Sequence, residues 1–127
     1  MMNYQYYLFD ADGTILDTAE LICRSMENTL KVMGGSPPSP GDIITKIGLP
    51  LKKQLQIYLP KLAEEDYNKA ARLHAEYQCS IHKEHLRLFP DVKETLKSLK
   101  NTGKTLAIIT SRKRPSLSLY LEAMGIY

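Results

Sequence analysis

The sequence predicts an α/β fold built around a parallel sheet and interrupted by a long helical insert. Two short apolar stretches, residues 4–9 and 105–109, have the composition of buried strands. Helical periodicity follows each of them, and strands that alternate with helices form parallel sheets. The segment between them is far longer than one crossover requires. We therefore expect a sheet domain of residues 1–16 and 89–127 and a helical domain of residues 17–88.

The composition excludes several classes of protein. The 127 residues are 43% hydrophobic and 24% charged, which is near the average for folded soluble domains. The 17 basic and 14 acidic side chains leave a net charge of +3, too small to favour nucleic acid. The longest apolar run, residues 106–109, is too short to cross a membrane, and the first ten residues lack the basic region of a signal peptide. We expect no nucleic acid partner and no membrane partner.

The first strand ends abruptly at Asp10, and Gly13 indicates a tight turn directly after it. The strand is apolar on both faces, which predicts burial on both sides, as in a parallel sheet. Asp17 with Glu20 three residues later has the pattern of a capping box, so we expect Asp17 to cap the first helix.

Four helices are expected in the insert. Apolar residues recur at helical spacing over residues 19–33, and a proline-rich loop follows. Shorter helical patterns cover residues 42–46 and 51–59, and a longer one covers residues 63–85. After the insert, Asp91 and Glu94 form a second capping-box pattern before a helix. A buried strand over residues 105–109 and a helix that opens at Arg114–Pro115 complete the expected order.

Cysteines and histidines give little support for a metal site in the insert. Cys23 and Cys79 lie within helical patterns without the spacing of metal ligands, so we expect reduced thiols in a cytoplasmic protein. His74, His82 and His85 share the long helix, and we expect them on an exposed face. The alternative is a metal shared by His82 and His85, which are three residues apart.

The segment from Asp10 to Asp17 is the most informative part of the chain. Two carboxylates, Asp10 and Asp12, follow a buried strand and repel each other unless a cation or a proton lies between them. Mg²⁺ would fit, because it prefers carboxylate and carbonyl oxygens. An ordinary turn rich in aspartate and glycine is an equally good reading of the spacing alone.

A second polar segment follows the second strand. Thr110 and Ser111 come between this strand and a helix, where ligands bind in sheets of this type. Three basic residues, 112–114, are unfavourable at a helix N-terminus unless an anion offsets them. Phosphate is the obvious candidate, and a solvated basic loop is the alternative.

Together these segments resemble the haloacid dehalogenase superfamily of hydrolases. The first motif, D-x-D-G-T-x-x-D, is complete from Asp10 to Asp17, and Thr110 matches the hydroxyl of the second motif. Residues 88–96 resemble the segment by which the chain in this family passes from the cap back into its Rossmann-like core. The insert resembles the helical cap of the phosphoglycolate-phosphatase-like branch, with residues 47–51 similar to its substrate-specificity loop.

The resemblance implies a role for each matching residue. Asp10 would be the nucleophile that forms an aspartyl phosphate, and Asp12 would be the general acid and base. Mg²⁺ would be held by the Asp10 carboxylate and the Asp12 carbonyl, and Thr110 with Ser111 would bind the phosphoryl group. In the cap, the implied substrate-specificity residues are Gly48, Leu49 and Lys52.

The implied function is a Mg²⁺-dependent phosphatase of small phosphorylated metabolites, with phosphoglycolate-type substrates as the first candidates. A sugar phosphomutase, which uses the same aspartates, is one alternative, and a non-catalytic binding module is another. The sequence does not indicate an oligomeric state. The family's later lysine and acidic metal ligands have no match here, so we expect the chain to be the N-terminal part of a longer enzyme and inactive alone.

Overall fold

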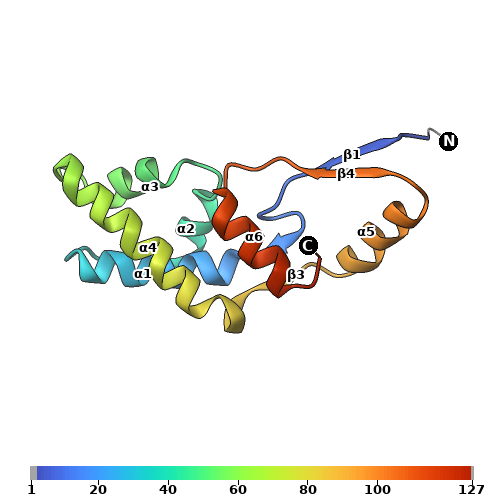
Figure 1. Cartoon of the computed structure of the whole chain (residues 1–127). Helices are drawn as coiled ribbons and strands as arrows, with labels where there is room; N and C mark the ends of the chain where they lie inside the picture. Colours follow the sequence, from blue (N-terminus) through green and yellow to red (C-terminus); the bar gives the residue numbers. More distant parts are fainter. Residues whose placement is uncertain (1–2, 127) are drawn as a thin grey trace. The chain divides into compact units, whose positions relative to one another are not determined.

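A computed structural model describes residues 3–126, and the chain forms two compact units (Figure 1). One unit contains the residues up to Thr18 together with those from Leu86 onward, and we call it the sheet unit. The other contains Ala19–His85, and we call it the helical unit. Parallel strands and helices occur together, so the predicted α/β class is confirmed.

The sheet unit contains the predicted parallel pair of strands. β1 (Tyr6–Phe9) pairs with β4 (Thr105–Ile108) in a register that matches their first and last residues, and the two lie side by side in Figure 1. α5 (Val92–Asn101) precedes β4 and packs against it, and α6 (Arg114–Ala123) follows. A parallel pair requires such a crossover, because the chain must return to the same end of the sheet.

The predicted burial of both strands on two faces is wrong. Side chains alternate between exposed and partly buried along β1 and β4, and Tyr6, Leu8 and Ile109 are 70%, 64% and 63% exposed. Successive side chains of a strand point to opposite faces. Within residues 3–126 the sheet has two strands, and the face that carries Tyr6 and Leu8 remains exposed.

A second, antiparallel pair of strands was not expected from the sequence. β2 (Leu16–Asp17) pairs with β3 (Arg87–Leu88), and the Phe89 N–H donates to the Ile15 carbonyl at 3.3 Å. This pairing brings together the two ends of the segment that contains the helical unit. Two-residue strands carry too little periodicity to be recognised in a sequence.

Neither capping box forms as predicted. Asp17 lies in β2, and the first helix begins only at Ala19. Asp91 does precede α5, but it has a φ of 64°, and its side chain makes no capping hydrogen bond within the described part of the chain. Strand pairing with Arg87 explains the first case, because it holds Asp17 one position too early for a cap.

The helical unit contains the four predicted helices. They are α1 (Ala19–Val32), α2 (Pro40–Thr45), α3 (Leu51–Tyr58) and α4 (Glu64–His85). α1 packs against α2 and α4, and α3 also packs against α4. The apolar positions form one core: Ile22, Cys23, Met26, Leu30, Ile43, Leu55, Leu59, Tyr67 and Ala70.

The histidines of α4 are less exposed than expected. His74 and His82 are 7% and 5% exposed, so their predicted place on a solvated face is wrong. His85 lies 3.2 Å from a carboxylate oxygen of Glu20. Over residues 3–126, no group of three or more histidine, cysteine or acidic side chains is arranged to hold a metal. The apolar pattern of α4 predicts which apolar residues are buried, but it does not show that the neighbouring polar residues His74 and His82 are buried with them.

Both cysteines are free thiols, Cys23 buried and Cys79 exposed. Burial, together with the nearby charge of Glu27, raises the pKa of the Cys23 thiol.

In the part of the chain that the structure describes, none of the helices combines the length and the apolar composition needed to span a bilayer.

Candidate functional site

The end of the parallel sheet brings Asp10 and Thr110 to the same edge. Asp10 directly follows the last residue of β1, Phe9, and Thr110 lies two residues after the end of β4. The Ile109 N–H donates to the Phe9 carbonyl at 2.8 Å, which extends the strand pairing to this edge. Parallel pairing therefore places the two residues at the carboxyl ends of neighbouring strands, where open α/β sheets bind ligands.

The turn after Asp10 is fixed by backbone hydrogen bonds. The carbonyl of Ala11, which is fully buried, accepts from Thr14, Ile15 and Leu16 at 3.2, 3.0 and 2.9 Å. The Gly13 N–H donates to the Leu16 carbonyl at 2.9 Å, and Gly13 has a φ of 84°. This left-handed conformation is strained for residues with a Cβ, which explains glycine here.

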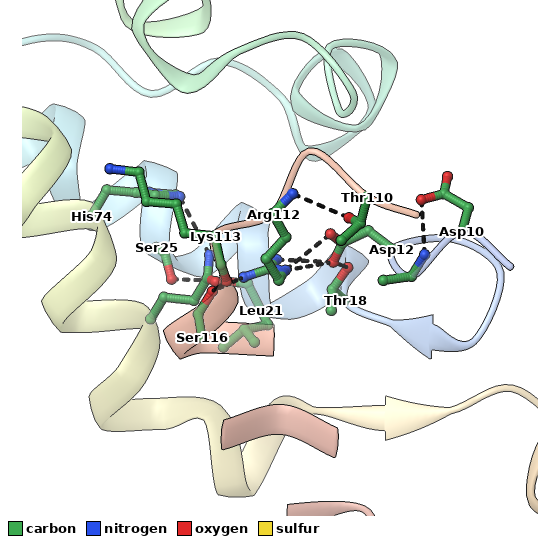
Figure 2. A network of polar contacts seen from close by, with 12 residues as sticks. Asp10, Asp12, Thr18, Leu21, Ser25, His74, Thr110, Arg112, Lys113 and Ser116 are labelled. Atoms are coloured by element: carbon green, nitrogen blue, oxygen red, sulfur yellow. Dashed lines mark hydrogen bonds and ion pairs between the residues drawn. The ribbon is translucent and has the colours of Figure 1, made fainter. Parts of the chain in front are cut away.

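The two aspartates have different surroundings (Figure 2). The Asp10 side chain is exposed, and its Oδ1 accepts the N–H of Ala11 at 2.8 Å. Asp12 accepts the hydroxyl of Thr18 on Oδ1 at 2.7 Å. It also accepts Arg112, from Nη2 to Oδ1 at 2.8 Å and from Nε to Oδ2 at 3.0 Å. In Figure 2 the Asp10 carboxylate lies apart from this pair.

Arg112 is held by several groups of the sheet unit. Its backbone N–H donates to Oγ1 of Thr110 at 3.1 Å, and its Nη1 lies 3.4 Å from Oγ of Ser116. The guanidinium carbon lies 4.9 Å from the ring centre of Tyr120, within the range of a cation–π contact. Ser111, the second predicted phosphate-binding residue, is exposed beside them.

The sequence does not indicate the contacts of Arg112 and Thr18 with Asp12. It presents Arg112 as part of a basic segment that could bind an anion, and in the structure Arg112 pairs with the carboxylate of Asp12. The two residues are 100 positions apart in the sequence. The available signal was the placement of a basic residue after the second strand, on the edge where Asp12 follows the first.

Two oxygens at this edge suit a divalent cation. Within residues 3–126, no hydrogen bond or ion pair is found on Oδ2 of Asp10, and none of the turn's backbone hydrogen bonds ends on the Asp12 carbonyl. Mg²⁺ takes one or two carboxylates and keeps several waters, so this donor set fits it. The Asp12 carboxylate is engaged by Arg112 and Thr18, which leaves its carbonyl as the available donor.

The predicted substrate-specificity residues lie in the helical unit, and the catalytic candidates lie in the sheet unit. Gly48 has a φ of 109°, between Ile47 and Leu49, which form a β-bridge. Gln54, a buried residue of α3, donates to the Leu49 carbonyl at 2.9 Å and supports this loop. Lys52 forms an ion pair with Glu64.

The whole pattern is matched by one protein family. The family of haloacid dehalogenase-like hydrolases matches residues 7–127, which include both strand ends and the segment between them. This chain belongs to the haloacid dehalogenase-like hydrolase family. The resemblance inferred from the two motifs is therefore confirmed.

Relatives within the family carry phosphatase names. A pyrophosphatase PpaX of Oceanobacillus iheyensis is 30% identical over 125 residues, which are 98% of this chain and 56% of that protein. A phosphoglycolate phosphatase of Aquifex aeolicus is 30% identical over 119 residues, which are 94% of this chain and 54% of that protein. This chain thus spans about half the length of the relatives that it matches.

Solved structures share the fold. The crystal structure described as a predicted phosphoglycolate phosphatase from Haemophilus somnus has a TM-score of 0.86 at 26% identity, over 99% of this chain and 60% of that one. A structure described as a predicted phosphatase from Clostridium acetobutylicum has a TM-score of 0.85 at 26% identity, over 98% of this chain and 57% of that one.

Proposed function

We propose that this protein is a Mg²⁺-dependent phosphatase that hydrolyses small phosphorylated metabolites through an aspartyl phosphate on Asp10. The observation that carries the proposal is the shared edge of the sheet. In its support, Asp10, which is exposed, and Thr110, which carries a hydroxyl, both follow the carboxyl ends of the paired strands β1 and β4. The names of the relatives agree with a hydrolase of phosphate compounds.

Asp10 is the nucleophile in this proposal. Its exposed carboxylate can reach a substrate from solvent, and the Ala11 N–H on Oδ1 fixes its orientation. Attack on phosphorus forms the bond from Asp10 to the phosphoryl group and releases the alcohol. The hydroxyls of Thr110 and Ser111 supply hydrogen bonds to phosphoryl oxygens at the same edge.

Asp12 transfers the protons in both half-reactions. It first donates a proton to the leaving oxygen, and then it accepts a proton from the water that attacks the aspartyl phosphate. To donate first, Asp12 carries a proton on Oδ2 when the substrate binds, while its Oδ1 still accepts from Thr18 and from Nη2 of Arg112. Hydrolysis of the intermediate returns both aspartates to their initial state.

Mg²⁺ would be held by Asp10 and by the Asp12 carbonyl, and it would reduce the repulsion between the attacking carboxylate and the phosphate anion. The donor chemistry described above supports this assignment. Waters or further ligands would complete the coordination shell.

We further propose that the helical unit is the cap domain and that the loop with Gly48 and Leu49 selects the substrate. Lys52 beside this loop would attract the substrate's anion after exchange from Glu64. Phosphoglycolate and inorganic pyrophosphate are the first substrates to test, given the names of the relatives. The proposed location is the cytoplasm, in keeping with two free thiols.

The test is turnover by the whole protein. Phosphoglycolate, pyrophosphate and p-nitrophenyl phosphate are each incubated with Mg²⁺, and phosphate release is measured. We expect release that EDTA abolishes and that added Mg²⁺ restores. The proposal fails if none of these substrates is hydrolysed, or if the rate is unchanged in EDTA.

A further inference from the structure

The Asp12 carboxylate is bound on both oxygens by side chains of the sheet unit. Arg112 reaches it with two nitrogens, at 2.8 Å from Nη2 and 3.0 Å from Nε, and Thr18 donates at 2.7 Å. The Arg112 and Asp12 side chains are only 11% and 18% exposed. Bidentate pairs between arginine and carboxylate fix the relative orientation of the two groups as well as contribute energy.

The guanidinium is itself anchored. Tyr120, a fully buried residue of α6, lies beneath it, and the backbone N–H of Arg112 is bound to the Thr110 hydroxyl. Arg112 therefore connects the end of β4 and helix α6 to the turn that follows β1. A side chain fixed at its base and across its face can hold its partner in one orientation.

On the basis of the proposed function, we propose that Arg112 is a positioning residue that orients Asp12 for proton transfer. With the proton on Oδ2, Oδ1 still accepts from Nη2 of Arg112 and from Thr18, so the protonated side chain keeps this orientation and presents the proton on Oδ2. The Nε–Nη2 edge of Arg112 is occupied by Asp12, and Tyr120 lies against the guanidinium. These contacts favour positioning over the other role that the sequence suggests for a basic residue here, which is direct binding of the substrate's phosphate.

The two roles differ in which reactions they affect. A residue that orients the general acid matters most when the leaving group needs a proton, as an alkoxide does. It matters less for p-nitrophenolate, which leaves without much help. A residue that binds phosphate would matter equally for both, because both substrates carry the same phosphoryl group. Its loss would also weaken inhibition by inorganic phosphate.

The experiment uses the whole protein with Arg112→Gln, Arg112→Lys, Asp12→Asn and the double variant D12N/R112Q. The measured quantities are kcat/KM for an alkyl phosphate and for p-nitrophenyl phosphate, and the inhibition constant of inorganic phosphate. Because kcat/KM reports the steps up to release of the alcohol, slow hydrolysis of the intermediate does not mask the effect. Arg72→Gln, at an exposed position of α4, is the control for loss of an arginine.

We expect R112Q to lower kcat/KM for the alkyl phosphate by about 100-fold, the scale of a misplaced catalytic group. The loss for p-nitrophenyl phosphate should be smaller, and the inhibition constant of phosphate should not change. Lysine keeps the positive charge but lacks the planar guanidinium that binds a carboxylate through two nitrogens, so R112K should recover part of the rate. The double variant should be no slower than D12N, because the two residues act as a unit.

Three results would overturn the inference while leaving the proposed function intact. They are an equal loss for both substrates, a weaker inhibition by phosphate, or wild-type rates in R112Q when D12N is inactive. A wild-type protein without turnover would instead reject the proposed function, and this inference with it. Thermal melting checks that R112Q folds, and R112K provides the comparison if it does not.

Discussion

The helical unit and the sheet unit distribute their apolar side chains in opposite ways. In the helical unit, α1 to α4 enclose one continuous core that includes fully buried residues such as Leu30 and Leu55. In the sheet unit, apolar side chains of β1 such as Tyr6 and Leu8 are largely exposed. The sheet unit instead has a hydrogen-bonded ion pair between Asp12 and Arg112 at the edge where its parallel strands end.

This difference separates the largest buried core from the residues proposed to carry out the reaction. Burial of apolar surface is the largest favourable contribution to folding, and the helical unit provides most of the buried apolar residues. The proposed reaction requires exposed, oriented polar groups, and the residues proposed for it follow the strand ends of the sheet unit. Substitutions in the two units should therefore affect different measurements.

The largest effect is expected at Asp10. Asp10→Asn should reduce turnover by the whole protein to background, because an amide oxygen is a poor nucleophile and cannot form the phosphoryl bond. The melting temperature should hardly change, since the side chain is exposed. Asp91→Asn, an exposed aspartate of the same unit, should keep wild-type turnover. Substantial activity of the Asp10→Asn protein would refute the assignment.

The next effect is on stability and belongs to the helical unit. Leu30→Ala should lower the free energy of unfolding by about 2–5 kcal/mol, because it leaves a cavity in a closed core. Val32→Ala, in the same helix at a position 57% exposed, is the matched control and should cost well under half as much. Denaturant melts measure both, and equal losses would contradict the described core.

A third prediction compares the two units directly in the 127-residue chain. Backbone amides of α1 and α4 should exchange with deuterium more slowly than those of β1 and β4. Segments with few buried contacts open more easily, and within residues 3–126 each of these strands has a single strand partner. Hydrogen exchange followed by mass spectrometry gives the comparison. Slower exchange in β1 than in α1 would show that the sheet unit is the more stable of the two.

The smallest effect concerns a polar contact within the helical unit. Burial and a hydrogen bond to Asp42 raise the pKa of Tyr58 to about 12. The bonds from Tyr58 and Lys46 lower the pKa of the Asp42 carboxyl. The contribution of the Tyr58 hydroxyl to the free energy of unfolding is therefore complete below pH 10, the ordinary pKa of tyrosine, and is lost as the pH rises through about 12. The contribution of the Asp42 carboxylate to the free energy of unfolding is lost as the pH falls below the ordinary pKa of aspartate.

Tyr58→Phe should therefore melt at a lower temperature than the wild type at pH 7, and the difference should shrink above pH 10. Tyr77→Phe, on α4, is the control for loss of a tyrosine hydroxyl. Melting curves across the pH range measure both. A difference that stays constant up to pH 12 would show that the bond to Asp42 does not contribute.

The helices and the parallel strands could be predicted because each repeats a pattern over several residues. Helix α1 is an example, with apolar residues at Ile22, Met26 and Leu30 on one side. Burial of the strands could not be predicted, since an apolar stretch does not say how many strands or helices will cover it. The pairing of β2 with β3 could not be predicted, because a two-residue strand is too short to show a repeating pattern.

The candidate site was predictable only in part. Asp10, Asp12 and Thr110 each follow a recognisable strand, and strand order alone places their segments at one edge. The binding of Asp12 by Arg112 depends on a turn and on the position of Tyr120 beneath the guanidinium. Such contacts arise from tertiary packing between segments that are distant in the sequence.

The most direct test of the central claim is to trap the phosphorylated protein. The whole protein is mixed with Mg²⁺ and a hydrolysable phosphate ester, quenched in acid and digested, and its peptides are analysed by mass spectrometry. We predict one added phosphoryl group on Asp10, released by hydroxylamine as expected for an acyl phosphate and absent from the Asp10→Asn protein. Turnover without any phosphorylated peptide, or with the phosphoryl group on another residue, would contradict the account.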